Sequence, residues 1–193
     1  MKLKVAKAVR VATVAPISAF VVLTILYISR PEIFGNTMHY IFSLVFLVLV
    51  PISAYPLQPF VPGFKDQGRK GQRTLAMFTA ALGYVLGVIF LMFVPAPDDC
   101  LLIYLTHLLS GLLFLLFNKA LKIRASGHAC GLAGPVVALV YFLGAKALLG
   151  FLAFAAACWA SLVMKRHTKS ELAIGASISV LALFVSLLVV KIV

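Results

Sequence analysis

Long apolar segments, separated by short polar ones, follow one another along nearly the whole chain. Each is about 17 to 25 residues long, the length that an α-helix needs to cross roughly 30 Å of hydrocarbon. We place seven of them, at residues 11–29, 39–58, 75–94, 100–118, 128–145, 147–164 and 172–190. The pattern predicts an all-α fold, a polytopic transmembrane bundle of about six to seven spans. One of the first two segments could instead lie in the membrane interface.

The breaks between the apolar segments indicate how the spans are connected. The turns at residues 95–97 and 144–150 are very short, which is typical of antiparallel neighbours in a helical bundle. The fifth and sixth spans are therefore expected to form a tight hairpin. The first segment follows a basic start, as a signal peptide does, but it has no convincing small-residue cleavage site, so we keep it as a span.

Composition agrees with a membrane protein. Of 193 residues, 63% are apolar and only 11% are charged, which leaves no room for a soluble domain. The three cysteines are odd in number and have no partner at metal-ligand spacing, so we expect small apolar fillers rather than disulfides.

The net charge of +12 comes from cations in the short loops between spans. Alternating spans put 14 of the 17 cations on one face: Lys2, Lys4, Lys7, Arg10, Lys65, Arg69, Lys70, Arg73, Lys119, Lys122, Arg124, Lys165, Arg166 and Lys169. The positive-inside rule makes this face cytoplasmic, with the N-terminus inside. Orientation and anionic headgroups explain the charge more simply than nucleic acid, which we do not expect as a partner.

Acidic residues are too few for a clustered magnesium site. The chain has five, at Glu32, Asp66, Asp98, Asp99 and Glu171. A hard cation needs several oxygen ligands, and only two of these acids lie on the cationic face. We therefore expect neither a metal nor another cofactor.

Two of the four histidines, His128 and His167, lie on the cationic face, 39 residues apart. Two helices of about 18 residues, out and back across the membrane, would return the second imidazole to the level of the first. Glu171 follows His167 by one helical turn and can accept the ring's second N–H. Ser126 and Gly127 could add a hydroxyl and free N–H groups for an anion. We interpret His39 and His107 as interfacial and packing residues.

These residues resemble the type 2 phosphatidic acid phosphatase superfamily, whose motifs read Lys-x6-Arg-Pro, Pro-Ser-Gly-His and Ser-Arg-x5-His-x3-Asp. The second is similar to Ala125-Ser-Gly-His128, and the end of the third to His167-x3-Glu171. The chain departs from the family at Ser161, where the family has arginine, with Arg166 the nearest replacement. The loop at residues 65–74 has the cations of the first motif without its spacing or its proline. The resemblance covers roughly residues 60–190, so we divide the single membrane domain into two N-terminal spans, 1–58, and a core, 59–193.

The resemblance implies metal-independent hydrolysis of a lipid phosphate monoester or polyprenyl diphosphate through a phosphohistidine. His167 would attack phosphorus, Glu171 would orient it, and His128 would protonate the leaving oxygen. The phosphate would bind to residues drawn from Arg69, Lys70, Arg73, Arg124, Ser126, Gly127 and Arg166. Two alternatives stay open: a lipid phosphotransferase, and a non-catalytic binder or carrier of anionic lipid phosphates. The identity of the lipid and the oligomeric state are open as well.

Overall fold

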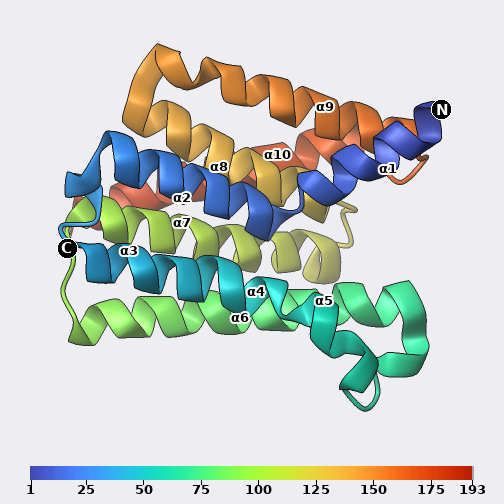
Figure 1. Ribbon diagram of the computed structural model, residues 1–193, viewed down its shortest axis with the longest axis horizontal. Helices are drawn as coiled ribbons and strands as arrows, with labels where there is room; N and C mark the ends of the chain where they lie inside the picture. The colour runs from blue at the N-terminus through green and yellow to red at the C-terminus, as the bar shows by residue number, and fades with distance from the viewer. Residues whose placement is uncertain (193) are drawn as a thin grey trace.

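The computed structural model describes residues 1–192, which form helices and no strands (Figure 1). Two π-helical turns, Val45–Leu49 and Leu116–Ala120, extend α3 and α7. The α-helices are α1 (Lys2–Ala12), α2 (Ala15–Ser29), α3 (Thr37–Leu44), α4 (Val50–Ile52), α5 (Ala54–Leu57), α6 (Gly68–Phe93), α7 (Asp98–Leu115), α8 (Gly127–Leu143), α9 (Gly150–Val163) and α10 (Lys169–Val190).

The helical runs have the length and composition of membrane spans, which confirms the all-α transmembrane bundle. Five are long and apolar enough to cross, and the bent pair of α1 and α2 would make a sixth. The five are Thr37–Phe60, Lys65–Phe93, Asp98–Ala120, Gly127–Val163 and Lys169–Val190.

The run Gly127–Val163 folds back on itself at Gly144, whose positive φ of 65° suits a residue without Cβ. Its two legs, α8 and α9, then lie side by side (Figure 1), with Leu132 and Val136 packed against Ala157 and Phe154. This is the hairpin expected between the fifth and sixth spans.

The first apolar segment is not one straight helix, so the single span expected at residues 11–29 is wrong in its bounds. Helix α1 begins at Lys2, and the direction of the chain bends by 57° between α1 and α2. Val14 is extended, and Pro16 lies in the first turn of α2, where its missing N–H costs nothing. The chain therefore breaks two residues before the proline.

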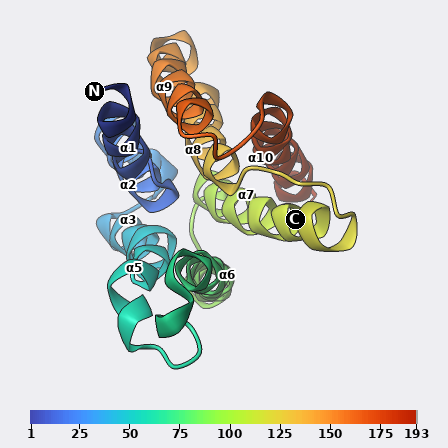
Figure 2. The ribbon, with the colours of Figure 1, turned by 90° about the vertical axis from the view of Figure 1, so that its right-hand side faces the viewer.

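The connections alternate between the two ends of the bundle. The N-terminus and the segments at 58–67, 121–126 and 164–168 lie at one end, and Figure 1 shows the end of α10 at the other. Figure 2 views the first of these ends, which we call the cationic end. It carries the loops that we predicted would share one face.

Helix α10 packs against α7 and α8, whereas α1 packs on α9 and α2 on α8. Small residues permit these approaches. A Cβ on Gly175 would collide with the carbonyl oxygen of Ser126, and one on Gly131 would collide with Ala15. Small residues let membrane helices pack closely, and here they bring α10 against the loop before α8 and α8 against the start of α2.

Candidate functional site at the cationic end

His167 lies immediately before α10, and Glu171 holds its ring. Thr168 caps α10 by accepting a hydrogen bond from the Glu171 N–H, at 3.2 Å, in a Thr-x-x-Glu sequence typical of helix starts. The Glu171 carboxylate turns back toward His167, and its Oε2 lies 2.7 Å from Nδ1. The expected contact is therefore present, and it leaves Nε2 as the nitrogen available to a substrate.

The loop before α8 is tied to the same carboxylate. Arg124 Nε lies 3.2 Å from Glu171 Oε1, and the Ser126 N–H donates to the Glu171 carbonyl oxygen at 2.9 Å. Ser126 Oγ accepts from the Ala129 N–H at 3.2 Å and so caps α8, and the side chain is fully buried. This gives Ser126 a structural role, and its contact with phosphate stays a prediction.

His128, in the first turn of α8, is bound by α1's C-terminal cap residue. Its Nε2 lies 3.0 Å from Thr13 Oγ1. The Thr13 hydroxyl donates to the Val9 carbonyl oxygen at 2.7 Å, so its oxygen accepts the proton from Nε2 of His128. His128 also lies within electrostatic range of His167. The hairpin thus brings the two histidines to one site.

Arg10, which we assigned to membrane orientation, reaches the same site. Its Nη1 donates to Ser161 Oγ at 2.8 Å, and that hydroxyl donates in turn to the Ala157 carbonyl oxygen at 2.9 Å. Ser161 is fully buried. One indirect signal of this contact was present in the sequence, because Ser161 stands at the position where the family that the chain resembles has arginine.

The structure brings together some of the predicted phosphate cations and not others. The charges of Arg73 and Arg166 both act on Arg10, and Arg73 also acts on His167. Arg69 and Lys70, in the first turn of α6, are exposed. Over residues 1–192 no hydrogen bond or ion pair joins either side chain to Arg10 or His167, so their place in a phosphate site stays a prediction.

Burial lowers the pKa of His167 below its ordinary value of 6.5. The hydrogen bond and the charge of Glu171 oppose this shift, whereas the charges of Arg10 and Arg73 add to it. His167 is therefore neutral near pH 7, as a nucleophile must be.

A cleft of about 310 Å³ opens beside this histidine. It is lined by Arg124, Leu162, Lys165, Arg166, His167, Thr168 and Glu171. The end of α9 shapes its wall, since the N–H groups of Lys165 and Arg166 donate to the carbonyl oxygens of Leu162 and Ser161 in a Schellman turn. Lys165 takes the left-handed position of that turn, with φ of 49°. The turn directs Arg166 and His167 to the cleft.

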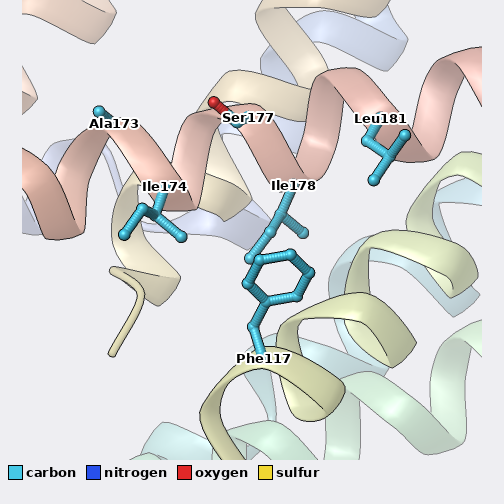
Figure 3. Close-up of a pocket in the computed structure, with 6 residues that line it drawn as sticks. All are labelled: Phe117, Ala173, Ile174, Ser177, Ile178 and Leu181. Atoms are coloured by element: carbon cyan, nitrogen blue, oxygen red, sulfur yellow. The ribbon is translucent and has the colours of Figure 1, made fainter. Parts of the chain in front are cut away.

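An apolar groove of about 230 Å³ lies further along α10. Figure 3 shows Ile174 and Ile178 pointing from α10 toward Phe117 of the π-helical turn after α7. Ile174 follows Glu171 by three residues, about 4.5 Å along the helix. The groove therefore begins close to the polar cleft.

The remaining histidines lie apart from this site. His39 is buried, with its ring edge-on to Phe90, and His107 packs against Tyr84 with Nδ1 2.8 Å from the Ile103 carbonyl oxygen. Over residues 1–192, no three histidine, cysteine or acidic side chains gather at distances suited to a metal ion.

The apolar helical runs define the chain as an integral membrane protein with a cluster of arginines and histidines at one end of its bundle. No family profile, no characterised protein and no solved structure matches it.

Proposed function

We propose that the protein is a membrane lipid phosphatase that forms a phosphohistidine on His167. One observation carries the proposal: the ring of His167 is held by the buried carboxylate of Glu171 at the edge of a cleft lined with cations. A carboxylate on Nδ1 fixes the tautomer and leaves the Nε2 lone pair free to attack. This arrangement suits a nucleophile better than a residue that only touches headgroups.

The reaction has two steps. In the first, Nε2 of His167 bonds to phosphorus while the bond from phosphorus to the lipid oxygen breaks, and that oxygen takes the Nδ1 proton of protonated His128, whose Nε2–H stays bonded to Thr13. In the second, Nδ1 of the now neutral His128 takes a proton from water, whose oxygen bonds to phosphorus while the bond from phosphorus to Nε2 of His167 breaks, which releases phosphate and restores His167. Arginines near the cleft neutralise the charge on the transferring group in both steps.

Two features support a lipid substrate. The polar cleft lies at an end of a membrane bundle, where headgroups lie, and the apolar groove that includes Ile174 begins about one turn further along α10 (Figure 3). A lipid whose phosphate occupied the cleft could lay its chain along this groove. We also propose that this end faces the cytoplasm, because it carries most of the cations.

Phosphoenzyme trapping in detergent tests the proposal. The full-length protein is incubated in EDTA with radiolabelled phosphatidate, phosphatidylglycerol phosphate or a polyprenyl phosphate, quenched in alkali and analysed for acid-labile phosphohistidine. We expect phosphate release and a labelled histidine, because the chemistry needs no metal. His167→Ala should abolish both. His128→Ala should still be labelled by an aryl phosphate, whose leaving group needs no proton.

Three results would reject the proposal. They are a label on His128, turnover by His167→Ala, and activity that EDTA abolishes and magnesium restores. A protein that lipid phosphates stabilise but that never releases phosphate would instead be a binder or carrier.

A further inference from the structure

Arg10 is placed where a cation in a membrane helix would not ordinarily lie. Long basic side chains near helix ends usually extend to water or headgroups. Arg10 instead turns inward to Ser161, 151 residues away, and donates a 2.8 Å hydrogen bond to a hydroxyl that is fully buried. Its guanidinium is therefore held inside the cationic end.

No acid compensates this charge. Across residues 1–192 the ion pairs are Arg30–Glu32, Arg124–Glu171 and His167–Glu171, and Arg10 takes part in none of them. Its charged neighbours are instead Arg73 and Arg166. Arg10 is partly buried, and the charges of the exposed Arg73 and Arg166 repel its own, an arrangement that an anion bound among them would stabilise.

The end of α1 contacts both sides of the proposed phosphohistidine site. Arg10 bonds to Ser161 on α9, and Thr13, one turn later, accepts a hydrogen bond from His128 on α8. The Ser161 contact uses one of the five N–H donors of the guanidinium and fixes the plane of that group, since Ser161 is itself anchored to the Ala157 carbonyl oxygen. The other donors stay available to an anion.

We infer that Arg10 is a ligand of the phosphoryl group, so that α1 supplies part of the anion site although it lies outside the segment that resembles the phosphatases. The identity of the anion rests on the proposed function. The inference itself concerns which side chains bind phosphate, and it can be tested without turnover.

Orthovanadate, which resembles a phosphoryl group during transfer, is the probe. Its Kd is measured by calorimetry on the detergent-solubilised full chain, for the wild type and for Arg10→Gln, Ser161→Ala and Lys7→Gln. Lys7 lies exposed on the same helix and is the matched control. We expect Arg10→Gln to weaken binding roughly 10- to 100-fold, the scale of a lost charge-assisted hydrogen bond. Lys7→Gln should remain within about twofold of the wild type, as is usual for a screened surface charge.

Ser161→Ala separates binding from helix docking. It removes the hydrogen bond that orients Arg10 but keeps the charge, so we expect a smaller loss than for Arg10→Gln. An equal loss in both variants would mean that Arg10 only docks α1 on α9, which would overturn the inference. Wild-type affinity in Arg10→Gln, or no vanadate binding by the wild type, would overturn it too.

Arg10→Lys keeps the test decisive if the glutamine variant does not fold. Lysine retains a charge and a donor for Ser161 but lacks the planar fork that binds two phosphate oxygens, so we expect a loss of roughly 3- to 10-fold. Unchanged affinity would contradict the inference. The phosphohistidine assay reports separately on the proposed function: if vanadate binding depends on Arg10 but no phosphoenzyme forms, only the proposed function is rejected.

Discussion

At the scale of single residues, Glu171 is the carboxylate on which the cationic end depends. It is buried, and its two oxygens contact His167 at 2.7 Å and Arg124 at 3.2 Å. One negative charge therefore orients the histidine and holds an arginine at the mouth of the cleft. In the proposed reaction, its removal should affect the rate and its pH dependence together.

The pH dependence of kcat/KM should follow the protonation of His167, because the protonated imidazole has no lone pair with which to attack phosphorus. Because burial lowers its pKa below 6.5, we expect activity to be full near pH 7 and to fall only as pH drops below 6.5. Glu171 raises this pKa, so Glu171→Gln should move the acid limb to lower pH and reduce the rate roughly 10²- to 10⁴-fold. Arg73 lowers the pKa, so Arg73→Gln should move the limb to higher pH.

Lys65→Gln is the control for this measurement, since Lys65 is exposed and is not among the groups that act on His167. Its acid limb should match that of the wild type. Shifts of Glu171→Gln and Arg73→Gln in the same direction would contradict the assignment of the limb to His167.

The contact of His167 with Glu171 was predictable because it is local: four residues on a helix start bring two side chains to one face. The contact of Arg10 with Ser161 was not, because it spans 151 residues and depends on how α1 packs on α9. The sequence carried only half of this information. It showed that position 161 has serine where the motif has arginine. It did not show that the guanidinium of Arg10 reaches this position instead.

At the scale of elements, α10 approaches the loop before α8 so closely that only glycine fits at position 175. A methyl group there would collide with the Ser126 carbonyl oxygen, which is backbone and cannot turn away. The same loop donates the Ser126 N–H to the Glu171 carbonyl oxygen. The position of the Glu171 carboxylate therefore depends on this approach.

Gly175→Ala should lower both stability and activity. Overpacking of this kind costs about 1 to 3 kcal/mol, and a small displacement of a catalytic group costs roughly 10- to 100-fold in rate. Thermal unfolding in detergent and phosphatase assays measure the two effects. Gly134→Ala is the matched control, since its new methyl would lie 3.6 Å from Ser179 Cβ, in ordinary contact. Equal unfolding temperatures for the two variants would contradict the argument.

Most of the helices were predictable from hydropathy, but some of their irregularities were not. The turn at Gly144 was visible as a short break between apolar segments. The break between α1 and α2 was not recognised, because residues on both sides of Thr13 are apolar and Pro16 suits a helix start as well as an interruption. The π-helical turn at Val45–Leu49 leaves no mark in an all-apolar pattern.

At the scale of the whole molecule, the grouping of loops was predictable and the lateral order of helices was not. Each span reverses the direction of the chain, so counting spans assigns every loop to an end, as Figure 1 shows. Which helices become neighbours is a different matter. Between apolar helices in lipid there is no hydrophobic force to select partners, so neighbours depend on shape, as where α1 lies on α9 and α2 on α8.

The orientation of the bundle in the membrane follows from the cations, and the Arg10 inference changes that argument. Cations that bind a substrate say nothing about orientation, so Arg10 no longer counts with the N-terminal group, whereas Lys2, Lys4 and Lys7, exposed on α1, still do. Three lysines next to the first apolar segment still favour a cytoplasmic N-terminus. The cationic end should then face the cytoplasm.

Cysteine labelling in intact cells tests this orientation with single cysteines at exposed positions. Asp66→Cys and Ser170→Cys lie at the cationic end, and Lys146→Cys lies in the opposite turn. The partly exposed Cys158 is first replaced by alanine. An impermeant maleimide should label only the Lys146→Cys variant from outside, and the other two only after permeabilisation.

External labelling of both Asp66→Cys and Ser170→Cys would reverse the orientation and move the proposed substrate to the outer leaflet. Labelling of those two variants from opposite sides would mean that the starts of α6 and α10 lie on opposite faces of the membrane. That result would contradict a site that Arg73 and His167 share.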